Sequence, residues 1–164
     1  MSNKTAHSKT VTITTPTDRE VVINRVFDAD PDLVFKALTK PELVRQWCVP
    51  DGWSMDLCEI DLKVGGRWHF VSCRPDGKKI GQLGVYQEIV PGERLVNTES
   101  WEDWDAGETL VTTALAGADG KTEFTSTILF PSREVRDVVL KSGLEESVGP
   151  IYDKLADVLA GIGD

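Results

Sequence analysis

The C-terminal part of the chain, residues 131–161, carries apolar residues at helical spacing. Glu, Asp, Lys and Arg occupy most of the remaining positions, so the predicted helix has one apolar face and one charged face. The apolar positions are Val135, Val138, Val139, Leu144, Val148, Ile151, Tyr152, Leu155, Val158 and Leu159. Such a face must be buried, and the middle of the chain, which reads as successive strands, is the expected partner.

Gly143 and the pair Gly149-Pro150 interrupt this pattern. A proline inside a helix removes one hydrogen bond, at a cost of roughly 3 kcal/mol. One straight helix of this length would also span ~46 Å at ~1.5 Å per residue, which exceeds the width of a small domain. We therefore expect a broken or kinked helix. Its first segment, Val135–Leu144, is expected to move over the mouth of a binding space, and its second to be fixed to the sheet.

Upstream of this helix, short alternating runs are separated by turn residues every ten or so positions, which is typical of an antiparallel meander. A strand at residues 19–27 is followed by two short helices that begin at Pro31 and Pro41, because proline is tolerated at the first helical position. Six more strands are predicted at residues 53–60, 67–73, 80–89, 94–101, 108–116 and 122–130, and Val11–Thr14 could extend along a sheet edge. The pattern predicts an α+β fold in the order β-α-α-β6-α, in which a curved seven-stranded antiparallel sheet surrounds a long C-terminal helix.

The alternation within the strands also predicts which side chains face the helix. On the strand at 67–73, Trp68 and Phe70 share a face. The corresponding inward sets on the strands at 94–101 and 122–130 are Leu95, Asn97, Glu99 and Trp101, and Phe124, Ser126 and Ile128. A strongly curved sheet closed by one helix tends to leave a space between them, lined by these residues.

Composition narrows the function classes. The chain of 164 residues has 18 basic and 27 acidic residues and a net charge of −9, which disfavours nucleic acid as a partner. Its three cysteines, Cys48, Cys58 and Cys73, form no CxxC or Cys/His cluster, which favours reduced, structural thiols. The polar N-terminus lacks a signal-peptide core, and no long apolar run occurs. We expect a cytoplasmic protein with a flexible segment at residues 1–17 and no integral membrane association.

Four stretches, in this order along the chain, resemble the START-like (SRPBCC) superfamily, and more narrowly its branch similar to the activator of heat-shock-protein-90 ATPase. They are Asp18–Ala29, Val34–Trp47, Asp61–Trp68 and Gly84–Leu95. The resemblance extends over residues 18 to 161 and implies one START-like helix-grip domain at residues 18–164, with an internal cavity for hydrophobic molecules. Because folds of this kind host binding, cyclisation, transport and co-chaperone roles, the resemblance by itself does not select one of them.

No GxSxG, HExxH, P-loop or GxGxxG motif is present, so the sequence predicts no cofactor, no metal site and no catalytic residue. His69, the only histidine outside the N-terminal tail, alternates with Trp68 and Phe70 and is expected on the outer face or at a rim. The acidic, aromatic stretch Glu99–Asp105 is the most unusual in composition. It is either a strand end with a solvated loop or the rim of a pocket, where indoles offer apolar area and Glu99 accepts a hydrogen bond.

The candidate ligand-binding residues share an aromatic or apolar character and an expected position between helix and sheet, apart from the acidic Glu99. They are Trp47, Trp53, Trp68, Phe70, Tyr86, Glu99, Trp101, Phe124, Val135, Val148 and Tyr152. The alternative for the aromatic members is ordinary core packing.

Three functions remain open at this point. The first is binding of a small hydrophobic or aromatic molecule between the C-terminal helix and the sheet, without demonstrated catalysis. The second is a cyclase- or hydrolase-type enzyme for a polyketide- or lipid-like substrate, for which Glu99 with Tyr86 would be the acid/base pair. The third is a co-chaperone-like interaction module, suggested only by the name of the resembling branch.

The role assigned to Glu99 gives a first prediction. Replacing Glu99 by Gln should weaken binding of a ligand and leave folding intact, because the change keeps the shape and removes the charge. Ligand titration and thermal unfolding of the variant measure the two effects. A collapse of thermal stability would instead make Glu99 a structural residue.

Overall fold

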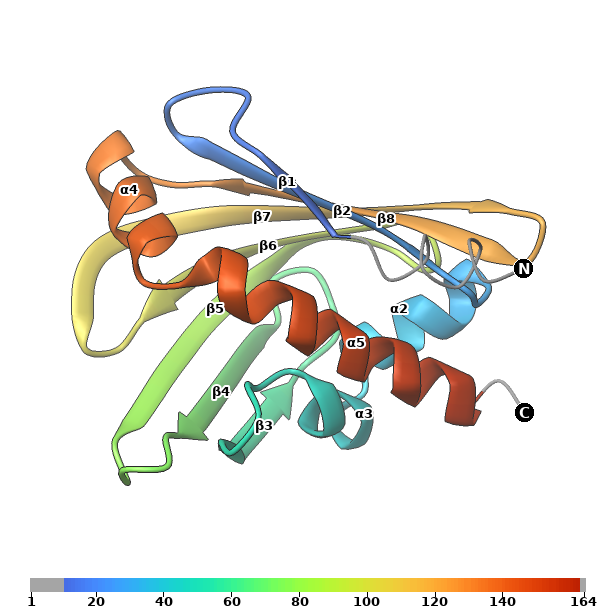
Figure 1. Cartoon of the computed structure of the whole chain (residues 1–164), viewed down its shortest axis with the longest axis horizontal. Coiled ribbons are helices and arrows are strands. Elements are labelled where there is room, and N and C mark those ends of the chain that lie inside the picture. The colour runs from blue at the N-terminus through green and yellow to red at the C-terminus, as the bar shows by residue number, and fades with distance from the viewer. Residues whose placement is uncertain (1–10, 163–164) are drawn as a thin grey trace.

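The computed structural model describes residues 11–162 and has an α+β architecture in which one antiparallel sheet curves around a C-terminal helix (Figure 1). The strands are β1 (Thr12–Thr14), β2 (Glu20–Phe27), β3 (Ser54–Ile60), β4 (Arg67–Cys73), β5 (Lys79–Val90), β6 (Arg94–Trp101), β7 (Trp104–Ala118) and β8 (Lys121–Leu129). Their order across the sheet is β1-β2-β8-β7-β6-β5-β4-β3. The helix-grip prediction is confirmed, with eight strands in place of the seven expected.

The additional strand is β1, which pairs with β2 at the edge of the sheet. It is only three residues long, and Val11–Thr14 was expected only as a possible edge extension. Of the segment predicted to be flexible, residues 1–17, the first ten lie outside the described residues.

Two short helices, α2 (Pro31–Thr39) and α3 (Pro41–Trp47), follow β2 and begin with proline, as the sequence predicts. Asp30 occupies the N-cap position of α2, but its side chain makes no capping hydrogen bond. Buried residues of both helices, among them Val34, Phe35 and Trp47, face the hydrophobic core. These helices are the main backbone neighbours of the C-terminal helix.

The C-terminal region contains α4 (Arg133–Lys141) and α5 (Leu144–Ile162). The predicted break at Gly143 is confirmed: its φ of 102° is a left-handed conformation that glycine adopts without strain. The second predicted break, at Gly149-Pro150, is wrong, because α5 continues through Pro150. Pro150 and Glu146 are both exposed, so the carbonyl that loses its helical donor can bond to water instead.

Two hydrophobic clusters lie between the helices and the sheet. The larger one joins Leu155 and Leu159 of α5 to sheet and α2–α3 residues such as Phe27, Trp68 and Phe124. The smaller one joins Val148 to Val21, Ile23 and Phe130, with side chains of α4 packed against it. Tyr152 contacts both clusters, and its ring lies 5.2 Å from that of Phe124 between centroids.

Polar contacts of the two residues that follow Tyr152 also fix α5. Asp153 accepts a hydrogen bond from the buried guanidinium of Arg25 on β2, at 2.8 Å. Lys154 donates to the carbonyl oxygen of Val49, after α3, and its ammonium lies 3.6 Å from Asp51. Adjacent residues of α5 therefore bind the sheet and the α3–β3 loop.

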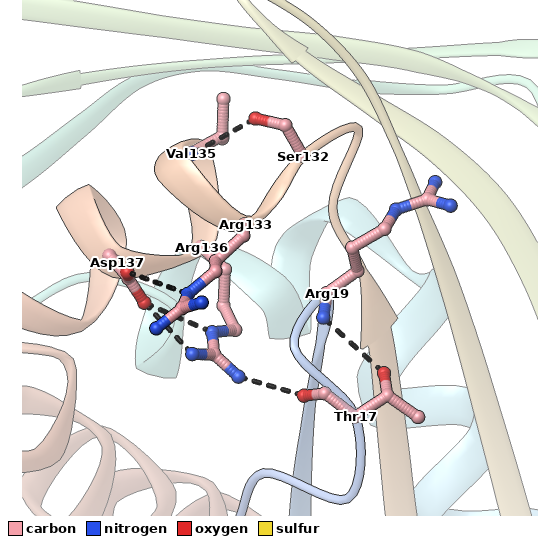
Figure 2. A network of polar contacts seen from close by, with 7 residues as sticks. All are labelled: Thr17, Arg19, Ser132, Arg133, Val135, Arg136 and Asp137. Atoms are coloured by element: carbon pink, nitrogen blue, oxygen red, sulfur yellow. Dashed lines mark hydrogen bonds and ion pairs between the residues drawn. The ribbon is translucent and has the colours of Figure 1, made fainter.

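Contacts at its N-terminus hold α4 (Figure 2). The backbone N–H of Val135 donates to Ser132 Oγ, so Ser132 is the N-cap of α4. Arg136 donates to the carbonyl oxygen of Thr17 at 2.7 Å and to the Asp137 carboxylate at 2.9 Å. None of the residues of α4 is fully buried, so these surface contacts and a half-buried apolar face attach it to the molecule.

Unequal burial predicts unequal protection from hydrogen exchange. Amides of α4 should exchange faster than those of residues 151–159, because Leu155 and Leu159 are 0% and 3% exposed while α4 has no buried side chain. Native-state exchange followed by NMR measures this difference. Equal protection of the two segments would contradict it and would also remove the basis for a mobile first segment.

Candidate functional site

Cross-strand pairing identifies the residues that face α5. Trp68, Tyr86, Leu95, Leu115 and Phe124, from five strands, lie in one cluster with Leu155. Strand alternation places Asn97 and Glu99 on the same face as Leu95, and Val111 on the same face as Leu115. The inward orientation predicted for β4, β6 and β8 therefore agrees with the register. We call this side of the sheet the concave face.

The predicted ligand-binding residues divide into two groups by burial. Five are buried in the two hydrophobic clusters: Trp47, Trp68, Tyr86, Phe124 and Val148. Six are half-buried: Trp53, Phe70, Glu99, Trp101, Val135 and Tyr152. The indole N–H groups of Trp47 and Trp68 already donate to the carbonyl oxygens of Ala37 and Thr98, so these two donors are not available to a ligand.

A half-buried region of mixed polarity lies on the concave face outside the two clusters. It consists of Gln82, Asn97, Glu99, Trp101 and Val111, which we call the inter-cluster patch. Asn97 pairs with Val111 across β6 and β7, and Gln82 pairs with Trp101 across β5 and β6. The apolar members, Trp101 and Val111, belong to neither cluster. This part of the concave face therefore lies outside the hydrophobic clusters.

Gln82 and Val111 were absent from the predicted site. Gln82 alternates ambiguously with Leu83 in the sequence, and only the pairing with Trp101 shows which of the two faces inward. Val111 looks like any strand valine until the register places it opposite Asn97. No sequence signal short of the register identifies either residue.

Glu99 is the ionisable member of the patch. Gln82 Nε2 donates to Glu99 Oε2 at 2.9 Å. Within residues 11–162, no Lys, Arg or His forms an ion pair with the Glu99 carboxylate. Removal from water raises its pKa to about 7. Glu99 thus takes up or releases a proton near neutral pH.

The ionisable groups that influence one another around Glu99 come from several elements. Burial raises the pKa of the Cys48 thiol to about 12, and the nearby Glu99 carboxylate adds to this effect. Burial also raises the pKa of Tyr152 on α5, again with a contribution from Cys48 and Glu99. Cys48 is consequently a protonated, weakly nucleophilic thiol, and Tyr152 a neutral phenol.

One polar atom beside the patch has no partner. Thr109 pairs with Glu99 across β6 and β7 and is only 1% exposed. Its hydroxyl is the single sealed side-chain oxygen or nitrogen without a hydrogen bond in the described part of the chain. An unsatisfied buried hydroxyl costs about 1–3 kcal/mol, so this end of the patch is not optimised for stability.

His69 and the turn of the acidic, aromatic stretch lie outside the patch. His69 Nε2 is 2.8 Å from Glu102 Oε1, on the outer face of the sheet, where Gly81 leaves room for the carboxylate. The stretch forms a tight hairpin, because Glu102 and Asp103 make the turn and Trp104 already begins β7. Trp101 and Trp104 contact each other at 5.3 Å between ring centroids. The solvated loop is therefore reduced to two residues, and Trp101 lies at the rim of the patch.

A separate pocket of about 400 Å³ opens between β1 and the start of α5, lined by Val11, Ile13, Glu145 and Gly149. None of the predicted ligand-binding residues lines it. It is open to solvent and has only two apolar side chains in its wall, whereas the inter-cluster patch combines aromatic area with a desolvated carboxyl. We therefore take the patch as the candidate site.

The curved antiparallel sheet, the gripping helix and the half-buried patch between them define a START-like helix-grip protein. The sequence profile of the family described as Activator of Hsp90 ATPase homolog 1-like protein matches residues 28–160. The chain belongs to this family.

Solved structures of bacterial proteins share the fold. A protein from Rhodobacter sphaeroides has 30% identity and a TM-score of 0.85, with 92% of this chain and 98% of that chain covered. A protein from Nitrosomonas europaea has 24% identity and a TM-score of 0.82, with coverage of 91% and 99%. An AHSA1-like protein from Aeromonas hydrophila has 19% identity and a TM-score of 0.67, with coverage of 88% and 94%. The last two likenesses concern the fold alone.

Comparison with functionally curated proteins gives no match. Among the helices of residues 11–162, none is long and apolar enough to cross a membrane.

The raised pKa of Glu99 predicts a pH-dependent stability difference. The folded-state pKa of about 7 exceeds the ordinary value of 4.5, so the wild type loses stability as the pH rises from about 4.5 through 7. Glu99→Gln has no proton to lose and should therefore exceed the wild type by roughly 1–3 kcal/mol at pH 8, and by much less at pH 5. Urea unfolding at both pH values measures the difference.

Glu102→Gln is the matched control, because it removes the same charge from the outer face of the same hairpin. A stability difference for Glu99→Gln that does not change with pH would contradict the desolvated state of this carboxyl.

Proposed function

We propose that this protein binds a small apolar or aromatic molecule between α5 and the concave face of the sheet. The observation that carries the proposal is the inter-cluster patch, whose half-buried aromatic and polar side chains lie on the concave face outside both hydrophobic clusters. A half-buried surface with aromatic walls and a few polar groups is typical of small-molecule sites. The resemblance to START-like proteins supports the same location.

The arrangement of α5 supports this site. Its backbone neighbours are α2, α3 and α4, so large side chains such as Tyr152 span the distance to the sheet. A helix held at this distance leaves room wherever no large side chain reaches across.

Glu99 favours a second candidate, an acid/base enzyme acting on a polyketide- or lipid-like substrate. A carboxyl with a pKa of about 7 is suited to transfer protons at neutral pH. Tyr86, expected as its partner, is a neutral phenol because burial raises its pKa. Turnover that disappears in Glu99→Gln while binding persists would favour this enzyme over a binding protein.

The co-chaperone alternative rests on the family name and on no contact within the structure.

The three cysteines form no disulfide, which agrees with the reducing cytoplasm that we propose as the location of the protein.

A steric variant tests the binding proposal. Val111→Trp adds an indole at the centre of the patch and should weaken binding of the neutral fluorophore Nile red at least about tenfold, a change of ~1.4 kcal/mol. Thr112→Trp, the adjacent residue on the outer face, is the control and should bind like the wild type. Fluorescence titration gives the affinities, and proton–nitrogen NMR should show the Trp101 indole signal shifting on binding while those of Trp47 and Trp68 move little.

Absence of saturable binding by the wild type would contradict the proposal. So would an equal loss in both tryptophan variants, because the ligand would then not occupy the concave face.

A further inference from the structure

We propose that the ligand is a lipophilic amine whose ammonium group pairs with Glu99 while its apolar body occupies the inter-cluster patch. This inference rests on the proposed function and adds the chemical class of the ligand. It follows from the small number of hydrogen-bond and ion-pair partners that the described residues supply to the Glu99 carboxylate.

Glu99 is only partly satisfied by protein groups. Gln82 Nε2 occupies Oε2, and no hydrogen bond from a described residue reaches Oε1. The indole N–H of Trp68, on the same face, is unavailable because it donates to the carbonyl oxygen of Thr98. One carboxylate oxygen therefore remains open to a donor from a ligand.

The neighbouring cations are engaged with other groups. Arg25, whose positive charge partly offsets the burial that raises the pKa of Tyr152, pairs with Asp153 at 2.8 Å. Lys154, whose positive charge partly offsets the burial that raises the pKa of Cys48, contacts Val49 and Asp51 at the α3–β3 loop. A half-buried carboxylate without a cation is unfavourable unless it takes up a proton or a positively charged partner.

Aromatic groups beside Glu99 also suit a cation. Phe70 and Trp101 each pair with Gln82 from the flanking strands, so their rings adjoin the amide that holds Glu99. An ammonium group is attracted to the faces of such rings, by about 0.5–2 kcal/mol in general. The net charge of −9 further attracts cations and repels an anionic ligand.

The ionisation of Glu99 then makes amine binding depend on pH. The other ionisable groups around the site are Cys48 after α3, Cys58 on β3, Tyr86 on β5, and Tyr152 and Lys154 on α5, with Arg25 on β2. Burial raises the pKa of both cysteines and both tyrosines, so these four remain neutral below pH 8. An alkylamine, like lysine, stays charged in this range. Glu99 is therefore the group whose charge changes between pH 5.5 and pH 8.

Three probes with the same aromatic body test the inference: naphthylethylamine, naphthylethanol and naphthylacetate. At pH 8 the wild type should bind the amine about tenfold more tightly than the alcohol, and the acid least. In Glu99→Gln the ratio of amine to alcohol affinity should fall to about one, with alcohol binding retained. Glu102→Gln, which removes the same negative charge from the outer face, should keep the wild-type ratio. Calorimetric titration measures all nine affinities.

The pH profile of the wild type is a second measurement that needs no variant. The ratio of amine to alcohol affinity should shrink about fivefold or more from pH 8 to pH 5.5, as Glu99 takes up its proton. If Glu99→Gln does not fold, this profile decides the question.

The outcomes separate the two proposals. Equal affinities for amine and alcohol, or a ratio that survives in Glu99→Gln, would overturn the amine inference and leave the proposed binding function standing. Failure of all three probes, together with failure of Nile red, would overturn both.

Discussion

The packing of Tyr152 against Phe27, Trp47 and Phe124 sets the distance between α5 and the sheet, on which both the core and the site depend. The ring centroids lie 5.2–6.3 Å apart, and the rings meet edge to face or tilted. This one side chain takes part in both hydrophobic clusters. The main backbone neighbours of α5 are the helices, so large side chains such as Tyr152 reach from it to the strands. The side chains of the inter-cluster patch belong to neither cluster and remain half-buried.

The polar contacts of Asp153 and Lys154, the two residues after Tyr152, fix the orientation of α5 rather than the burial of its side chains. Arg25 is almost fully buried while its partner Asp153 is half exposed, so the pair places a charge in the interior whose desolvation offsets much of the attraction. Lys154 directs the next residue of the helix toward the α3–β3 loop. Because Asp153 reaches Arg25 on β2 and Lys154 reaches the α3–β3 loop, the two contacts together define the rotation of α5 about its axis. That rotation turns Tyr152 and Leu155 toward the sheet.

The sequence predicts most of this fold because burial imposes periodicity. Alternation in the strands and the apolar stripe of α5 are local consequences of a buried face, and both are visible without a structure. Breaks are harder to predict: Gly143 ends a helix because its backbone turns left-handed, whereas Pro150 is tolerated because it faces water. The site is the least predictable part. Glu99 stands out by composition, and strand alternation places Asn97 on its face, but Gln82 and Val111 come to lie beside them only through a register set by pairing across three strands.

The inter-cluster patch is also where the chain departs from what stability alone would select. An apolar residue in place of Glu99 would avoid the desolvation that raises its pKa to about 7, and Thr109 beside it holds an unsatisfied hydroxyl. Elsewhere on the concave face the same strands carry the buried residues Tyr86, Leu95 and Leu115. These strands bury apolar side chains at most inward positions but place a desolvated carboxyl and an unpaired hydroxyl at the neighbouring positions Glu99 and Thr109. The loss of stability is therefore concentrated at one place. Stability gives no reason for that concentration, whereas the ligand that we propose would supply the missing donor to Glu99.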